Sequence, residues 1–128
     1  MVETGRFLRF CVVGTIGFVA DAGCTLLLNL VAGLAPLRAR IAAFVIAATV
    51  TWALNRGFTF RSTAGVGSWA PYVLLTGLGA LINIGIYWAW IAIIGTVPLA
   101  ILAGVALGSI VALGFNFLVS SAIFQRSS

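Results

Sequence analysis

The sequence predicts an all-α polytopic membrane protein, whose four transmembrane helices form two hairpins related as a parallel repeat. Of the 128 residues, 62% are hydrophobic and only 7% are charged. The mean hydropathy of +1.22 is far from the balance of a water-soluble domain. A soluble core of this size leaves too much of its surface in water to hide so many apolar side chains. The apolar residues also fall into four runs that approach the roughly 20 residues needed to cross a bilayer as a helix.

The four predicted helices cover residues 10–32, 37–54, 70–94 and 98–120, and the whole chain, 1–128, is expected to form one domain. Gly33 to Pro36 is a tight turn, and Gly95 to Pro98 is another, so each joins two antiparallel helices. Residues 55–69 hold a Gly/Ser/Thr-rich stretch without the apolar period of a helix. This segment is predicted to be the linker between two hairpins.

The arginines predict which side each loop occupies. With four spans both termini and the linker share one side, which carries five arginines, whereas the other side carries two. The positive-inside rule therefore places the termini and the linker in the cytoplasm. A signal peptide is the alternative for the first run, but that run continues long enough to span the membrane. The cytoplasmic group is Arg6, Arg9, Arg56, Arg61 and Arg126, and the outer group is Arg38 and Arg40.

The end of the second helix aligns with the end of the fourth, which indicates an internal repeat. Each hairpin leaves the membrane through an aromatic residue, a polar residue and an arginine. Because each unit contains two spans, both copies keep one orientation, as in parallel-repeat transporters. The aligned pairs are Trp52 with Phe117, Asn55 with Ser120 and Arg61 with Arg126, and Gly14, Gly17 and Asp21 match Gly77, Gly79 and Asn83 more loosely.

The composition argues against several classes of function. There is no His and there are only two acidic residues, so the chain alone cannot assemble the usual hydrolytic or metal sites. Cys11 and Cys24 lie inside the first apolar run without the spacing of a metal site. We therefore expect no enzyme activity, no metal and no cofactor. The arginines are scattered singly, so anionic membrane lipid is a better partner than nucleic acid.

Asp21 is the residue whose position most needs an explanation. It lies about 12 residues beyond Arg9, which places it roughly 18 Å into the membrane at 1.5 Å per residue. A carboxylate there costs about 2.5 to 3.5 kcal/mol, so it should face the bundle interior. Asn83 has a similar depth and is the expected hydrogen-bond partner, and Asn29 shares a helix face with Asp21. A binding site and a purely structural hydrogen bond both remain open.

Asn55, Arg56 and Arg61 place amide and guanidinium donors at the end of the second helix, at the depth of lipid phosphates. The planar fork of arginine suits bidentate phosphate binding. Ordinary anchoring to lipid headgroups is the alternative.

Three blocks of sequence resemble the GtrA-like family of small bacterial membrane proteins with four helices. They are the opening block from Arg6 to Gly17, the block from Leu54 to Arg61, and Asn116-Phe117. The resemblance spans nearly the whole chain. The chain departs from the family at Thr51-Trp52, where Asn-Phe is usual, and at Ser120 and Ser121, where further basic residues are usual.

The resemblance implies a flippase-like role in the bacterial cytoplasmic membrane, moving a polyprenyl-phosphate-linked sugar to the outer leaflet for cell-surface polysaccharide synthesis. It also makes a homodimer and a polyprenyl-phosphate glycosyltransferase partner reasonable. A non-transporting scaffold for that enzyme and a small multidrug exporter are the alternatives. The implied roles are phosphate binding by Arg9, Asn55, Arg56 and Arg61, a headgroup path along Asp21, Asn29, Asn83 and Asn116, and outer-side release at Arg38 and Arg40.

Overall fold

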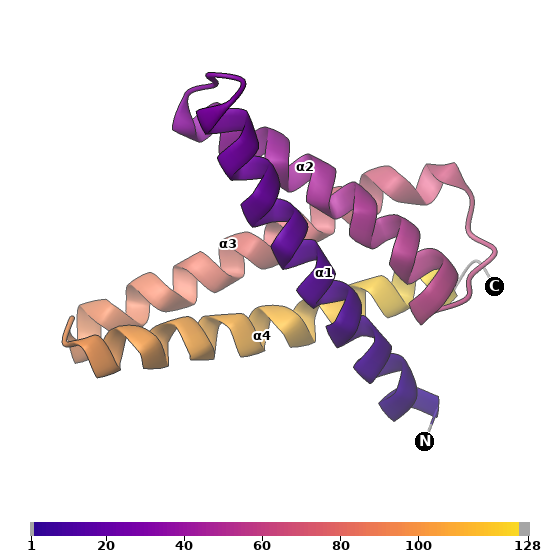
Figure 1. The fold of residues 1–128 in the computed structure, drawn as a ribbon. Helices are drawn as coiled ribbons and strands as arrows, with labels where there is room; N and C mark the ends of the chain where they lie inside the picture. The colour runs from indigo at the N-terminus through magenta and orange to yellow at the C-terminus, as the bar shows by residue number, and fades with distance from the viewer. Residues whose placement is uncertain (1, 126–128) are drawn as a thin grey trace.

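The computed structural model describes residues 2–125, which form four long helices and no strands (Figure 1). Each long helix has the length and the apolar composition to cross a membrane, which confirms the predicted all-α membrane class. Arg126, which was assigned to the cytoplasmic group, lies outside the described residues. The helices are α1 (Val2–Leu30), α2 (Pro36–Leu54), α3 (Trp69–Ile94) and α4 (Pro98–Gln125), with a π-helix, η1 (Asn55–Thr59), after α2 and a 3₁₀ turn, η2 (Val66–Ser68), before α3.

Glycine and proline set the ends of both hairpin turns. Gly33 and Gly95 have φ angles of 75° and 109°, which side chains other than glycine rarely allow. Pro36 and Pro98 are the first residues of α2 and α4. At this position a backbone N–H would have no hydrogen-bond partner within the helix, so proline loses no hydrogen bond by lacking it. The two turns therefore lie where the sequence predicted them.

The helical structure extends well beyond the predicted spans at three places. The first helix begins at Val2 instead of residue 10, and the fourth continues to Gln125 instead of residue 120. The predicted linker, 55–69, begins with the five residues of η1, which continue the helical path of α2. The reason is that apolar runs mark only the hydrocarbon part of a span, whereas a helix continues into the headgroup region by satisfying its own backbone.

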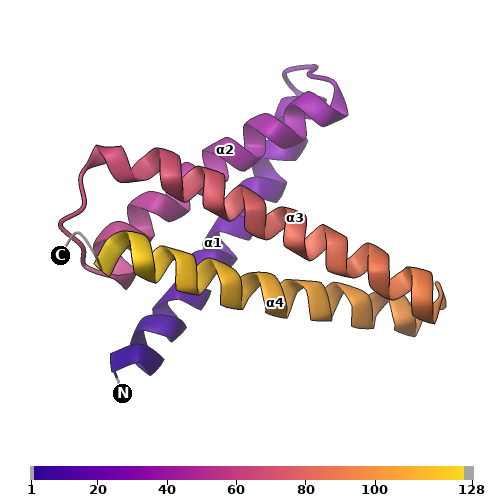
Figure 2. The ribbon, with the colours of Figure 1, turned by 180° about the vertical axis from the view of Figure 1, so that it is seen from behind.

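The two hairpins cross and then diverge. α1 packs along α2, and α3 packs along α4. Figures 1 and 2 show the hairpins crossing and their two turns pointing away from each other, with both chain ends on the side away from those turns. The result is a pair of arms that are joined at the end where α2 leads into η1 and α4 ends.

Each hairpin closes over a seam of buried small residues on its second helix. Members of a seam recur every fourth residue, so they share one face and let the neighbouring backbone approach closely. Each residue of the first seam is separated from its counterpart in the second by the same number of positions along the chain, which agrees with a repeated hairpin. Ala39, Ala43 and Ala47 on α2 correspond to Gly104, Gly108 and Ala112 on α4.

A buried aromatic cluster joins the two hairpins. Phe10 of α1 lies with its ring centroid 5.4 Å from Phe117 of α4, and Phe60, directly after η1, stacks on Phe124 at 5.4 Å. Tyr72 of α3 contacts Phe124 at 5.7 Å. Such pairs add about 0.5 to 1.5 kcal/mol each beyond the burial of their area. This cluster holds the crossing point, because all four helices or their extensions contribute to it.

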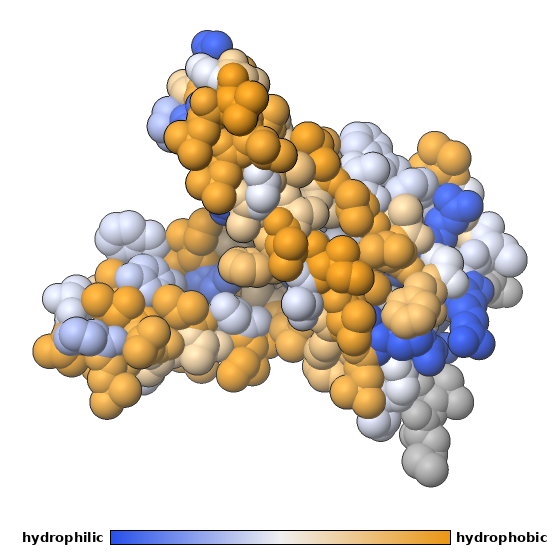
Figure 3. Space-filling view, viewed as in Figure 1, coloured by the Kyte–Doolittle hydropathy of each residue, from blue (hydrophilic) through white to orange (hydrophobic). Residues whose placement is uncertain are grey.

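The outer faces of the arms are apolar. Large aliphatic side chains such as Leu30, Leu74, Leu102 and Ile93 are 66–81% exposed. Figure 3 shows hydrophobic atoms over both arms and a strongly hydrophilic group near the end that carries the termini. Without water in the bilayer core, such faces are suited to contact lipid.

Gly108 supplies a stability test of the α3/α4 seam. A methyl carbon at this position would lie 2.7 Å from the backbone oxygen of Asn83, so the helices would have to separate. We expect Gly108→Ala to destabilise the fold by about 1 to 3 kcal/mol, the usual cost of overpacking. The measurement is the midpoint of denaturant-induced unfolding in detergent micelles.

Gly114 on the same helix is the matched control, because nothing lies within 4 Å of the added carbon. Gly114→Ala should leave stability unchanged or raise it by up to about 1 kcal/mol, since alanine is the better helix former. If both variants behave alike, the close packing at Gly108 is not what holds this hairpin.

Candidate functional site

A cavity of about 390 Å³ lies between the two hairpins, and residues of all four helices line it. Its apolar lining includes rings such as Phe10 and Phe44 and small residues such as Gly14, Gly17 and Ala47. These small residues leave room in which the polar side chains are grouped. The polar lining consists of Asp21, Arg40, Thr51, Asn55, Tyr72, Thr76, Asn83 and Asn116.

Asp21 and Arg40 form an ion pair at this cavity. The Arg40 Nη1 donates to Asp21 Oδ2 over 3.4 Å, and the Arg40 side chain is 61% exposed whereas that of Asp21 is 24% exposed. The other carboxylate oxygen, Oδ1, is buried and has no hydrogen-bond partner within residues 2–125. The predicted partner, Asn83, was therefore wrong for this hydrogen bond, although Asn83 lines the same cavity as Asp21.

Asn83 and Asn116 face the cavity from the α3/α4 hairpin, and each packs against a glycine of the opposite helix. The Asn83 side chain lies over Gly108, and the Asn116 side chain lies over Gly79. A Cβ at either glycine would collide with the amide. Asn116 Oδ1 is buried without a hydrogen-bond partner in the described part of the chain. The two amides therefore occupy, at the cavity wall, the space that a side chain at Gly108 or Gly79 would need.

A buried hydrogen-bond network forms one end of the cavity, where α2 becomes η1. Asn55 is 1% exposed; its Nδ2 donates to the Tyr72 hydroxyl over 2.9 Å, and its Oδ1 accepts from Thr59 Oγ1 over 2.7 Å. The Tyr72 hydroxyl in turn donates to Thr51 Oγ1 over 2.9 Å. A π-helix is rare and is frequently found at functional sites. This π-helix begins at Asn55, and the hydrogen bond from Asn55 to Tyr72 joins the end of α2 to α3.

This network corrects one prediction. Asn55 was expected to bind a lipid phosphate at the membrane surface, but its amide is buried and already hydrogen-bonded within the protein. Tyr72 of α3 is buried as well, with 2% of its surface exposed. Its hydroxyl needs buried partners in an apolar bundle, which explains its place in the network.

Arginines collect near the same end of the molecule. The Arg9 Nη2 donates to the Thr59 carbonyl over 3.3 Å, which ties α1 to η1. The Arg56 guanidinium carbon lies 5.2 Å from the centre of the Trp52 ring, and that of Arg6 lies 5.8 Å from the Phe60 ring. Cation–π contacts of this kind orient a guanidinium over the face of the ring.

Arg61 completes this set. It is exposed and has a φ angle of 49°, a left-handed conformation that ends η1. The Ser62 N–H then donates back to the Arg56 carbonyl over 2.8 Å. We call Arg6, Arg9, Arg56 and Arg61 the arginine rim.

Two further predicted residues lie away from the cavity lining. Asn29 donates through Nδ2 to the Leu34 carbonyl over 2.9 Å, so it stabilises the α1–α2 turn and does not line the headgroup path. Arg38 is exposed in the first turn of α2, near Arg40, but only Arg40 reaches the cavity.

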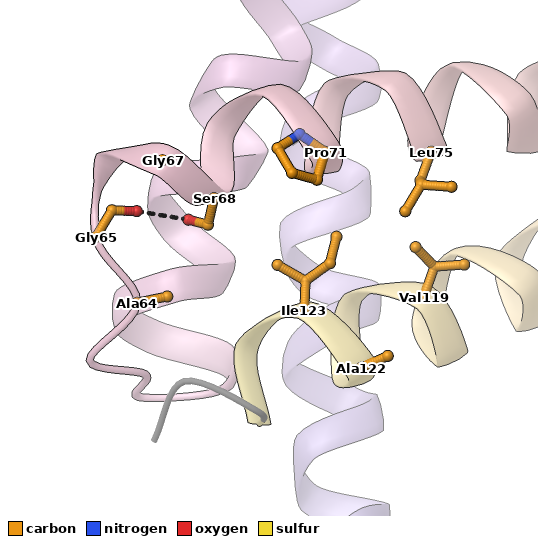
Figure 4. Close-up of a pocket in the computed structure, with 9 residues that line it drawn as sticks. All are labelled: Ala64, Gly65, Gly67, Ser68, Pro71, Leu75, Val119, Ala122 and Ile123. Atoms are coloured by element: carbon orange, nitrogen blue, oxygen red, sulfur yellow. Dashed lines mark hydrogen bonds between the residues drawn. The ribbon is translucent and has the colours of Figure 1, made fainter.

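A larger cleft of about 690 Å³ lies on another side of the α3/α4 hairpin, beside the loop that precedes α3. In Figure 4, Pro71 points toward Ile123 and Leu75 points toward Val119, and the Ser68 hydroxyl donates to the Gly65 carbonyl. No charged side chain among residues 2–125 lines this cleft. The polar chemistry of the described chain is concentrated in the smaller cavity.

Sequence reasoning missed the roles of Arg40, Thr51 and Tyr72. Arg40 was assigned to the outer surface by counting charges, although a guanidinium on a stem of three methylene groups reaches well beyond its own backbone position. Thr51 and Tyr72 are separated by 21 residues, so no local pattern joins them. The depth of Asp21 was the one available signal for an arginine partner.

The fold and this cavity define a multi-pass membrane protein with a polar site enclosed by two helical hairpins. The family described as GtrA/DPMS, transmembrane domain, matches residues 9–124, and the chain belongs to this family. Membership confirms the resemblance seen in the sequence and points to the handling of polyprenyl-phosphate-linked sugars. No solved structure shows significant similarity to the chain.

The Asn55 network leads to a second stability test. Asn55→Leu removes both amide hydrogen bonds and leaves the Tyr72 and Thr59 hydroxyls without these buried partners. The expected loss is about 1 to 3 kcal/mol, the range for an unsatisfied buried polar group. It is measured as the unfolding midpoint in micelles. Thr15→Val is the control, because Thr15 is exposed and bonds only the Cys11 carbonyl of its own helix. Equal midpoints for the two variants would contradict a stabilising network.

Proposed function

We propose that this protein translocates a polyprenyl-phosphate-linked sugar from the cytoplasmic to the outer leaflet of a bacterial cytoplasmic membrane, for cell-surface polysaccharide synthesis. The observation that carries the proposal is the cavity between the hairpins, which gathers an ion pair and amide side chains inside an apolar bundle. Ionisable groups at membrane depth are costly and mark transport paths. Family membership supports the class of substrate.

The arginine rim is the proposed entry for the phosphate. Arg9 and Arg56 have guanidinium groups oriented by a backbone carbonyl and by a Trp ring. Arginine binds phosphate oxygens through parallel N–H donors, and charge-assisted hydrogen bonds are about twice as strong as neutral ones. The rim would thus hold the phosphate at the membrane surface while the sugar lies near the cavity.

The cavity is the proposed path of the sugar. A sugar cannot enter hydrocarbon without replacing the hydrogen bonds that it makes with water. Asp21, Asn83 and Asn116 supply such bonds from three different helices. Arg40, which is largely exposed beside Asp21, is the proposed receiver of the phosphate on the outer side, together with Arg38.

The proposal includes a homodimer and an upstream enzyme. The splayed arms leave the cavity flanked by two hairpins only (Figure 1), and a second copy is the proposed cover for the remaining side. A polyprenyl-phosphate glycosyltransferase is the proposed source of the substrate. Cross-linking in native membranes that detects monomers alone would contradict the dimer.

Arg56→Gln tests the entry site. The substitution removes the guanidinium that lies over Trp52 and keeps a polar side chain of similar length. We expect transfer of a fluorescent polyprenyl-phosphate glucose between the leaflets of reconstituted vesicles to slow by about tenfold, because charge-assisted hydrogen bonds contribute about 1.5 to 3 kcal/mol.

A probe of the same chain and sugar, joined without the phosphate, is the matched control. Its transfer should be the same in the wild type and in Arg56→Gln. An equal loss for both probes would show that Arg56 supports the fold and does not bind phosphate. If the wild-type protein moves neither probe, the translocation proposal fails, and a scaffold role becomes the better explanation.

The proposed orientation has its own test. Thr63 lies in the loop before α3 and Thr96 lies in the α3–α4 turn, and both are exposed. In a chain with Cys11 and Cys24 replaced by Ala, Thr63→Cys should react with a membrane-impermeant maleimide only in inside-out vesicles. Thr96→Cys should react only in intact cells with the outer membrane permeabilised. The opposite pattern would contradict the proposed orientation of the chain and, with it, the proposed direction of transport.

A further inference from the structure

The unpaired atoms at the cavity are all of one kind. Asp21 Oδ1 and Asn116 Oδ1 are buried without a hydrogen-bond partner in residues 2–125, and both are acceptors. They belong to α1 and α4, one from each hairpin, and both side chains line the cavity. A buried acceptor without a donor costs about 1 to 3 kcal/mol. These two acceptors can therefore receive hydrogen bonds from a molecule bound in the cavity.

Three other polar groups of the lining do not donate to these two acceptors. The Thr51 hydroxyl donates to the Ala48 carbonyl, and that of Thr76 donates to the Tyr72 carbonyl. The Asn55 amide donates to Tyr72. The two hydroxyls are already used within the protein, whereas the amide nitrogens of Asn83 and Asn116 remain as further donors in the lining. A hydroxyl of a bound molecule can therefore donate to Asp21 Oδ1 or Asn116 Oδ1 and accept from a neighbouring amide.

The chemistry of the missing donors selects the part of the substrate that binds here. An ionised phosphate diester has only acceptor oxygens, so it cannot bond to the Asp21 carboxylate and needs guanidinium donors, such as those of the rim or of Arg40. Sugar hydroxyls carry the required O–H donors. The donor-rich arginine rim suits the phosphate, and the acceptor-bearing cavity suits the hydroxyls.

We propose that Asp21 and Asn116 form a hydroxyl-binding subsite that selects uncharged sugar headgroups over acidic ones such as uronic acids. This proposal rests on the proposed function and assigns the chemical class of the sugar to it. A sugar carboxylate would bring a second negative charge against Asp21 in a poorly solvated site, and like-charge contacts of this kind cost several kcal/mol.

Arg40 acts on this subsite as a positioning residue. It holds Asp21 Oδ2 over 3.4 Å and so keeps the carboxylate oriented with Oδ1 toward the cavity. Arg40 bonds only one oxygen of Asp21, so the other oxygen, Oδ1, keeps its preference for an uncharged donor.

The experiment compares two probes in reconstituted vesicles, a short-chain polyprenyl-phosphate glucose and the corresponding glucuronate. They share the phosphate and the ring and differ only in a hydroxymethyl group against a carboxylate. Both transfer between leaflets and equilibrium binding to the micelle-bound protein are measured. The wild type should favour glucose by about tenfold or more, since each 1.4 kcal/mol corresponds to a factor of ten.

Asp21→Asn should bring the glucose-to-glucuronate ratio close to one, because it removes the negative charge with almost no change in shape. The double variant Asp21→Asn with Arg40→Gln keeps the net charge of the wild-type pair and should also lose the preference. Thr15→Val, exposed on α1 and outside the cavity lining, is the control and should keep the wild-type ratio. The unfolding midpoint of each variant confirms that it is folded.

Each outcome separates this proposal from the proposed function. If the wild type moves both probes at the same rate, the subsite is wrong and translocation stands. If it binds glucose in preference to glucuronate but moves neither, the subsite stands and translocation fails. If it binds neither probe, both proposals fail. A preference that survives in both Asp21 variants would also overturn the role of the carboxylate.

Discussion

Hydrocarbon offers no hydrogen bonds, and this constraint decides where every polar group of the protein lies. The helices satisfy their own backbones, so only side chains need partners. Thr15, Thr25 and Thr49 return their hydroxyls to carbonyls of their own helices. Several other polar groups are brought together between the two hairpins, where Asn55 and Tyr72 pair with one another. The cavity between the hairpins holds two acceptors that no group of residues 2–125 pairs, Asp21 Oδ1 and Asn116 Oδ1.

The repeated hairpin explains why this place lies between the two units. At one constant offset, buried Asn55 and Thr59 correspond to buried Ser120 and Phe124. The first unit thus has a hydrogen-bonded pair where the second has a hydroxyl and an aromatic ring. Phe124 then packs on Phe60 and Tyr72, so the ring of one unit covers the polar network of the other. The two copies have become complementary, and their contact closes one end of the cavity.

The sequence was sufficient for the four helices, because long apolar runs have few other stable forms in a membrane. The glycine and proline residues were sufficient to predict where the two turns lie. Helix faces were harder to assign, since helices that are apolar all round give no periodic signal of which side is buried. The depth of Asp21 was therefore predictable, but its pairing with Arg40 depends on how α1 and α2 pack. Asn29 lies on the same helix face as Asp21, yet its amide is hydrogen-bonded to the Leu34 carbonyl in the nearby turn.

Donors and acceptors are separated along the proposed path. Guanidinium donors of Arg9 and Arg56 lie at one end, and another donor, Arg40, lies beside Asp21 further along. Between them the unpaired atoms are acceptors on Asp21 and Asn116. A headgroup with an anionic phosphate and a ring of hydroxyls has the reverse pattern, so each part has a different preferred position. Weak, exposed contacts such as that of Arg40 favour exchange over tight retention, and a carrier must release what it binds.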